Sequence, residues 1–155
     1  NSDGYMRVVR LAELYYNFAE VAYQAAGPDE IISVSGLNMS ARGAVNAVRA
    51  RVGMPEIPSG LTVADFEKRY RNDRRVEFAL EADRYFSLRR WKALGESSVV
   101  TGMKVSGTGA DLTYERFAFD KRPTSADKYL LYPIDLTEVS KVLELTGNDW
   151  QNPGW

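Results

Sequence analysis

The chain has 155 residues, of which 45% are hydrophobic and 26% are charged, the composition of a globular domain. Its 20 basic and 21 acidic side chains leave a formal charge of −1, which gives no general attraction to nucleic acid. The absence of cysteine and histidine excludes disulfides, thiolate nucleophiles, Cys/His zinc sites and imidazole catalysis. No apolar run approaches the roughly 18 residues of a membrane span, and residues 1–4 do not resemble a secretion signal.

Apolar residues at spacings of three and four predict a first amphipathic helix from Tyr5 to Ala26, ended by Gly27-Pro28. The residues expected on its core face are Val8, Leu11, Leu14, Tyr15, Phe18, Val21 and Ala22. A connector from Ile31 to Leu37 follows.

A second helix is expected after Asn38 or Ser40, either of which can cap it. Its expected core face is Ala44, Val45, Ala47, Val48 and Val52. Gly53 is placed to close this helix in a left-handed conformation, and Pro55 prevents its restart.

Residues 1–53 therefore have the pattern of one tetratricopeptide-like helical hairpin. Small residues would let the two helix axes approach closely; these are Ala19, Ala22, Ala41 and Ala44. A solenoid needs several repeats, and the sequence contains one. Either this hairpin packs on another part of the chain, or its neighbouring repeats are missing.

A third helix is predicted from Val63 to Lys92, opened by a capping box at Thr62-Val-Ala-Asp65. Neither proline nor glycine interrupts this stretch. The alternative is two helices with a break near Glu81 to Asp83. The result is a long helix within residues 62–93.

The remaining residues, 95–155, form a loop-rich region with short extended pieces. Gly95–Asp111 is expected to be exposed, with a loose hairpin through Val99–Val105, while Thr113–Asp120 and Tyr129–Tyr132 are expected to lie on the helices. Asp135 can cap a last helical turn. The tail from Gly147 to Trp155 contains two tryptophans, which predicts that it is docked.

Glu77 and Glu81 are the first catalytic candidates, because four-residue spacing on a helix could bring two carboxylates to one sugar ring. The arginines around them favour ion pairing instead. Nine basic and five acidic residues alternate between Glu67 and Lys92, and this mixture favours an ion-paired face over a phosphate-binding one. The glycines from Gly102 to Gly109 lack the spacing of a phosphate loop. No catalytic, metal or cofactor site is predicted.

Exposed aromatic rings could stack on the apolar face of a sugar, although for any single ring the sequence favours the alternative, in which the ring seals a loop onto the helices. The rings considered are Tyr114, Phe117, Phe119, Tyr129 and Tyr132, and Tyr114, Phe117 and Tyr129 are the ligand-binding candidates.

Several motifs resemble, in order and spacing, the C-terminal part of the SusD/RagB family. They are Arg10-Leu-Ala-Glu-Leu-Tyr15 with Ala19-Glu20, Asn46-Ala-Val-Arg-Ala-Arg51 with Gly53-Met-Pro55, Arg74-Arg-Val-Glu-Phe-Ala-Leu-Glu81, Arg84-Tyr-Phe-Ser-Leu-Arg-Arg-Trp91, Tyr129–Ile134 and Gln151-Asn-Pro-Gly-Trp155. The chain departs from the family pattern at Ala82, where Gly is frequent, at Ser87, where Asp is common, and at Asp135, where a second Pro often stands.

The resemblance implies a mainly α fold and a binder that is not an enzyme. Such a protein captures an oligosaccharide or another nutrient at the cell surface and delivers it to a SusC-like TonB-dependent transporter. It is attached to the outer membrane as a lipoprotein, through an N-terminal part that this sequence lacks, and it packs on that remainder of its own chain. The alternative is a helical scaffold segment that contacts the transporter and has no ligand site.

Together, the sequence predicts a single domain over residues 1–155 with a structural ion-pair network around the long helix. The network is expected to bury Glu77 and Glu81 against arginines from this helix or from the hairpin. Its predicted members are Glu77, Glu81, Arg74, Arg84, Arg10 and Arg49, with Arg51 as a further partner.

Overall fold

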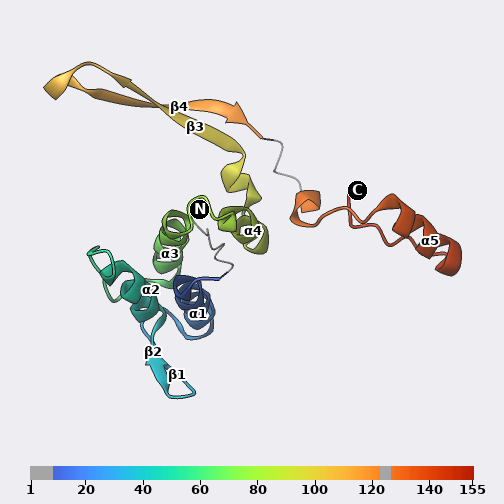
Figure 1. The fold of residues 1–155 in the computed structure, drawn as a ribbon, viewed down its shortest axis with the longest axis horizontal. Helices are drawn as coiled ribbons and strands as arrows, with labels where there is room; N and C mark the ends of the chain where they lie inside the picture. Colours follow the sequence, from blue (N-terminus) through green and yellow to red (C-terminus); the bar gives the residue numbers. More distant parts are fainter. Residues whose placement is uncertain (1–8, 123–126) are drawn as a thin grey trace, which may run out of the picture. The chain divides into compact units, whose positions relative to one another are not determined.

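The computed structural model describes residues 9–122 and 127–155, so the helix predicted over Tyr5–Val8 lies outside the described residues. Helices dominate, which confirms the mainly α class (Figure 1). The chain gathers into two compact units, Asn1–Ala79 (the first unit) and Leu80–Trp155 (the second unit). The organisation predicted from sequence, a single domain with three regions, stays a prediction.

Two helices, α1 (Leu11–Ala26) and α2 (Ala41–Ala50), pack together in the first unit. Gly27 ends α1 with a φ of 99°, and the Ser40 hydroxyl accepts a hydrogen bond from the Gly43 backbone N–H at 3.0 Å, so both predicted boundary signals are confirmed. The four alanines predicted to bring the axes together are buried: Ala19, Ala22, Ala41 and Ala44.

The connector predicted from Ile31 to Leu37 is instead a small hairpin of β1 (Ile32–Val34) and β2 (Leu37–Met39). Ser35 and Gly36 both have positive φ, of 50° and 85°, as the two central residues of a type I′ turn require. The prediction missed this turn because Ser-Gly is a weaker signal than Asn-Gly.

The predicted core face of α1 is largely wrong. Leu11, Leu14 and Val21 are exposed, and the buried residues are Tyr16, Ala19, Glu20, Ala22 and Tyr23. Tyrosine is buried here because aromatic rings of α3 pack against it, with ring centroids 5.5–5.7 Å apart. On α2, Ala44, Val45 and Val48 are buried as predicted, whereas Ala47 is exposed. Val52, predicted on the same face, lies beyond the end of α2 and is exposed.

The predicted long helix is two helices, α3 (Val63–Glu77) and α4 (Asp83–Arg90). The start of the helix at Thr62 is confirmed, because the Thr62 hydroxyl accepts the Asp65 N–H at 3.1 Å; the same hydroxyl donates to Asp65 Oδ2 at 2.7 Å. The break spans residues 78–82, beginning earlier than the sequence suggested, with Leu80 and Ala82 at φ 68° and 62°. These left-handed residues end the helical hydrogen-bond ladder.

The second unit contains α4, the short 3-10 helix η1 (Leu94–Ser97) and a long antiparallel hairpin of β3 (Val99–Ser106) and β4 (Thr113–Lys121). The prediction placed β4 on the helices, but all of its residues are exposed and its partner is β3. The 3-10 helices η2 (Gly109–Asp111) and η3 (Asp127–Leu130) lie at the hairpin's turn and before the last helix.

The last helix, α5 (Leu136–Thr146), is longer than the single turn predicted. Asp135 caps it by accepting the Thr137 N–H at 2.8 Å, and this hydrogen bond lowers the pKa of the Asp135 carboxyl. None of its residues is buried, although its apolar side chains recur at helical spacing.

Candidate functional site

A buried polar cluster lies at the centre of the first unit, between α1 and α3. The Tyr70 hydroxyl contacts Glu20 Oε2 at 2.8 Å and the Tyr16 carbonyl oxygen at 3.0 Å, and it accepts a hydrogen bond from Arg74 Nη1 at 3.1 Å. Arg74 also donates to Asn17 Oδ1 at 2.9 Å. Of these residues, the sequence predicted only Arg74 as a site residue; Tyr70 was not predicted, because Glu20 and Tyr16, two of its partners, come from another helix.

Glu77 joins α3 to the hairpin of α1 and α2. Its Oε1 accepts hydrogen bonds from Arg10 Nη1 at 2.8 Å and from Arg51 Nη2 at 3.0 Å, while Arg10 Nη2 donates to the Glu77 carbonyl oxygen at 3.0 Å. The side chain of Glu77 is 15% exposed. A carboxylate that accepts hydrogen bonds from two guanidinium groups is held in position by them, which suits a structural role.

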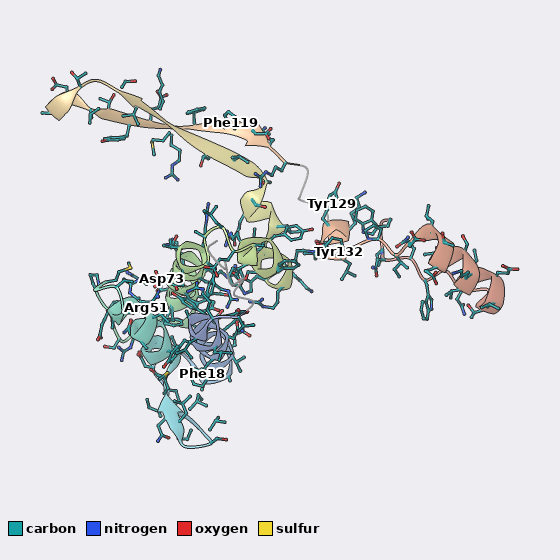
Figure 2. The ribbon with its side chains drawn as sticks, viewed as in Figure 1. Phe18, Arg51, Asp73, Phe119, Tyr129 and Tyr132 are labelled. Carbon is teal, nitrogen blue, oxygen red and sulfur yellow. The ribbon has the colours of Figure 1, made fainter. Side chains whose placement is uncertain are left out.

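Arg49 makes a second ion pair between α2 and α3. Its Nη1 lies 2.6 Å from Asp73 Oδ2, and its Nε donates to the Pro55 carbonyl oxygen at 2.7 Å. Figure 2 labels Asp73, the partner of Arg49, and Arg51, the partner of Glu77. The sequence predicted Arg49 as a member of the network but did not single out Asp73.

The expectation that Glu81 is buried is wrong. Glu81 is exposed, because the break at residues 78–82 removes it from the helix that carries Glu77. Arg84 begins a separate arrangement, in which its Nη2 donates to Glu96 Oε2 at 3.3 Å. The premise of a glycosidase pair therefore fails, since Glu77 and Glu81 do not share one helix face. No group of three or more acidic residues able to hold a metal ion occurs in residues 9–122 and 127–155.

The aromatic candidates on β4 do not form one platform. Tyr114 pairs with Val105 and Phe117 with Gly102, and residues three apart on a strand point to opposite faces. The Phe117 ring lies over Gly102, where an added Cβ would stand 2.8 Å from Cζ of the ring. Tyr114 and Phe119 (labelled in Figure 2) are 66% and 72% exposed, so neither ring seals a loop onto the helices.

Tyr129 and Tyr132 are held by neighbours within the second unit. The Tyr129 ring packs edge-on against Trp155 at 5.7 Å, and the Lys128 ammonium lies 5.2 Å and 4.8 Å from the centroids of these two rings. The Arg89 guanidinium lies 3.9 Å from the centroid of the Tyr132 ring and donates from Nε to the Leu130 carbonyl oxygen at 2.9 Å. The structure thus does not bring Tyr114, Phe117 and Tyr129 together.

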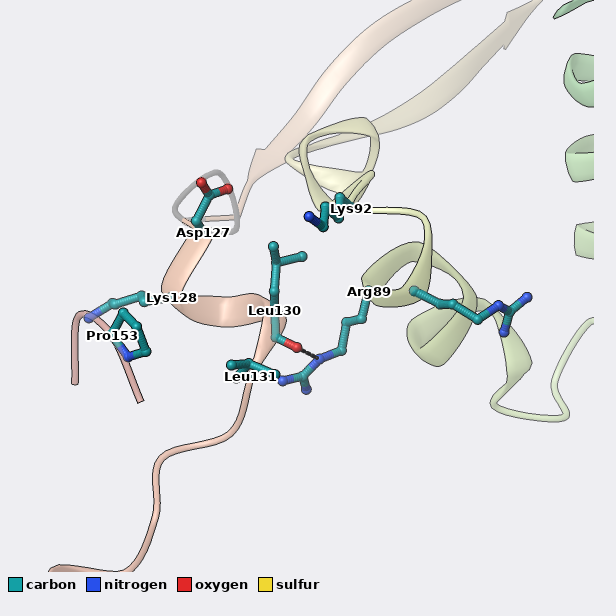
Figure 3. A pocket seen from close by; sticks show the side chains of 8 residues that line it. Arg89, Lys92, Asp127, Lys128, Leu130, Leu131 and Pro153 are labelled. Carbon is teal, nitrogen blue, oxygen red and sulfur yellow. Dashed lines mark hydrogen bonds between the residues drawn. The ribbon is translucent and has the colours of Figure 1, made fainter. Parts of the chain in front are cut away.

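A pocket of about 500 Å³ lies beside these rings, wholly within the second unit (Figure 3). The apolar part of its lining comes from Leu130, Leu131 and Pro153. The charged side chains that line it are Arg89, Arg90, Lys92, Lys128 and Asp127. The lining residues therefore include four cationic side chains, one carboxylate and an apolar surface, and we name this site the basic pocket. Its residues come from separate segments of the sequence, so no local motif marked it.

Comparison with known families decides the chain's membership. The model of the SusD family matches residues 1–155. The chain belongs to the SusD family. It is similar to the crystal structure of a SusD-like protein from Bacteroides fragilis, with a TM-score of 0.70 and 29% sequence identity over 95% of this chain. The chain spans 25% of that SusD-like protein's length. No curated protein matches the sequence.

The closing motif of this SusD-family chain fixes the segment before α5. Gln151 Oε1 accepts the Ile134 N–H and its Nε2 donates to the Ile134 carbonyl oxygen, both at 2.9 Å. Trp155 Nε1 donates to the Lys128 carbonyl oxygen at 2.9 Å. The tail is therefore docked, as predicted, through Gln151 and Trp155, while the Trp150 side chain is 64% exposed.

Proposed function

We propose that this chain is part of a cell-surface protein that binds an oligosaccharide or another nutrient and passes it to a SusC-like TonB-dependent outer-membrane transporter. The observation that carries the proposal is the match of the SusD family model across residues 1–155. The B. fragilis protein is described only as SusD-like, so ligand and partner remain part of the proposal. The protein is attached to the outer membrane as a lipoprotein through residues outside this sequence; within the described residues, no helix is both long and apolar enough to cross a membrane.

The charged residues of the first unit support binding without catalysis. Glu77 is bound by two arginines, and Asp73 is bound by Arg49 at 2.6 Å. A general acid or base must lie within reach of a substrate and exchange protons with it. Carboxylates committed to guanidinium groups between helices are poorly suited to that task, so we propose no enzymatic activity, cofactor or nucleic-acid partner.

The exposed apolar face of α1 supports the proposal that this chain packs against other parts of a longer protein. Leu11, Leu14 and Val21 are 67%, 57% and 68% exposed, and they form one stripe with Phe18 at spacings of three and four. Each hairpin of a helical repeat buries its faces against neighbouring repeats. Because the chain spans 25% of the SusD-like protein, we propose that a helix of the longer protein covers this stripe.

The second candidate is a scaffold segment that contacts the transporter and has no ligand site. The exposed hairpin β3–β4 favours it, because an isolated two-stranded hairpin is only marginally stable in water. Apolar side chains on this hairpin, among them Met103, Val105 and Tyr114, are about half exposed or more. A protein partner would bury them.

Calorimetry separates the two candidates. The whole protein that carries this sequence, and residues 1–155 alone, are titrated with a panel of oligosaccharides, and the transporter is sought by co-purification from outer membranes. The binding proposal expects heat from the whole protein with at least one oligosaccharide. Co-purification of the transporter with no heat from any oligosaccharide would contradict it and favour the scaffold.

A further inference from the structure

We propose that the basic pocket binds an acidic group of a sugar, a carboxylate or a sulfate carried on an oligosaccharide. This proposal rests on the proposed function, because it names the chemical class of the ligand. The family match itself indicates no acidic ligand; the pocket's geometry does.

The shape of the pocket is held by contacts that do not involve a ligand. Arg89 donates to the Leu130 carbonyl oxygen and to the Tyr85 hydroxyl, and its guanidinium covers the Tyr132 ring at 3.9 Å. Tyr85 and Tyr132 also contact each other, with centroids 6.4 Å apart. These contacts join α4 to the segment that carries Lys128 and Leu130, so the site is preorganised and loses little ordering entropy on binding.

The charge of the pocket favours an anion. Lys92 and Arg90 extend from the end of α4 and its following turn, and Lys128 comes from η3. Figure 3 shows Lys92 and Lys128 on either side of Leu130. Asp127 is the one carboxylate in the lining, so the cations outnumber it. An ammonium or guanidinium group recognises a carboxylate or sulfate by a charge-assisted hydrogen bond.

The walls of the pocket favour a sugar as the carrier of that anion. Leu130, Leu131 and Pro153 give an apolar surface, on which the C–H face of a pyranose ring can pack. Trp155 does not line the pocket; its ring lies next to it, with its centroid 4.8 Å from the Lys128 ammonium and its Nε1 bonded to the Lys128 carbonyl oxygen. A volume of about 500 Å³ accommodates a sugar unit.

The test uses the whole protein and three tetrasaccharide probes: tetragalacturonate, a sulfated carrageenan tetrasaccharide and neutral maltotetraose. We expect one or both acidic probes to bind and the neutral probe to give no heat. The carboxylate and sulfate probes identify which acid the pocket prefers. Binding should weaken by about tenfold when sodium chloride is raised from about 0.05 M to about 0.5 M, because salt screens exposed charges.

Charge-removing variants locate the site. Lys92→Gln and Lys128→Gln should each weaken acidic-probe binding by about tenfold, the loss expected for one charge-assisted hydrogen bond. Lys128→Arg should retain binding, because it keeps the cation. Lys68→Gln is the matched control, since Lys68 is exposed on α3 in the first unit, and it should bind as the parent protein does. Tryptophan fluorescence of each variant confirms that the second unit is folded.

Three outcomes would overturn the pocket proposal. The first is acidic-probe binding that is unchanged in both lysine variants. The second is binding of maltotetraose with no binding of either acidic probe, which would leave the proposed function standing. The third is loss of transporter co-purification in the lysine variants without loss of sugar binding, which would assign the pocket to a protein contact. Absence of heat from every oligosaccharide would refute the pocket proposal together with the oligosaccharide part of the proposed function.

Discussion

Removal of the Tyr70 hydroxyl should destabilise the first unit by about 2 kcal/mol. The Tyr70 side chain is fully buried, and its oxygen lies 2.8 Å from Glu20 Oε2 and 3.1 Å from Arg74 Nη1. Tyr70→Phe keeps the ring and its packing but removes both hydrogen bonds to charged groups, each of which contributes about 1.5–3 kcal/mol. Arg74 retains Asn17 as a partner, so we expect less than the full sum.

Urea denaturation followed by circular dichroism at about 222 nm measures this loss in the helices α1 to α3. Circular dichroism is preferred because the tryptophans, Trp91, Trp150 and Trp155, all belong to the second unit. With a slope of about 1 kcal/mol per molar urea, the midpoint should fall by about 2 M. Tyr15→Phe is the matched control, since Tyr15 lies on α1 and is only partly buried. A loss below about 0.5 kcal/mol for Tyr70→Phe would refute the reasoning.

Three further predictions concern the same unit and the break after it. Glu77→Gln should lower the unfolding free energy by about 1–2 kcal/mol. Glu138→Gln, which removes the charge from an exposed ion pair, should change it by less than about 0.5 kcal/mol. Equal losses for the two variants in urea denaturation would contradict the structural role of Glu77. Ala82→Gly should be neutral within about 0.5 kcal/mol and Ala82→Val should destabilise by about 1 kcal/mol, because only glycine adopts φ 62° freely; thermal melting that ranks Val above Gly would contradict this. Burial, reinforced by nearby carboxylates, raises the pKa of the Tyr16 phenol above its ordinary 10.0, so the native state retains a proton that the unfolded state loses. The contribution of Tyr16 to the unfolding free energy should therefore be constant below about pH 10 and fall above it. Tyr16→Phe should reduce the fall in urea midpoints measured from about pH 9 to about pH 11.

The helix ends were predictable from sequence because their chemistry is local. Ser40, Thr62 and Asp135 each accept a backbone N–H two or three residues along the chain, and Gly27 supplies the positive φ that ends α1. Each signal acts over fewer residues than one helical turn. Tertiary contacts were not needed to read them.

The break between α3 and α4 could not be located from local signals. The residues Ala79-Leu80-Glu81-Ala82 are among the strongest helix formers, so propensity favours a continuous helix through them. Tertiary packing overrides that preference and places Leu80 and Ala82 in left-handed conformations. The departure of Ala82 from the family's usual glycine was visible in the sequence, and it marks a position that adopts a positive φ.

The buried face of α1 was mispredicted because the helix is apolar on two sides. Hydrophobic periodicity favours the stripe of Leu11, Leu14 and Val21, whereas the structure buries Tyr16 and Tyr23. The tyrosines are buried because residues of α3 pack on their rings and form a hydrogen bond with the α1 backbone. Periodicity identifies apolar faces but does not say which neighbour covers each one.

The basic pocket could not be predicted from the sequence, because the residues that line it come from separate segments of the chain. The residues that hold its backbone differ in part from those that supply its charge. Residues of two family motifs fix the same segment: Arg89 bonds the Leu130 carbonyl oxygen, and Trp155 and Gln151 bond the backbone at Lys128 and Ile134. Lys92 and Lys128 lie outside the motif residues that hold the segment. The motifs thus set the backbone of the pocket and supply Arg89 and Arg90, while Lys92 and Lys128, which lie just outside the motifs, supply its other two cations. If the proposed function holds, substitutions at positions such as Lys92 and Lys128 would change the preference between acidic and neutral sugars and leave the backbone of the pocket unchanged.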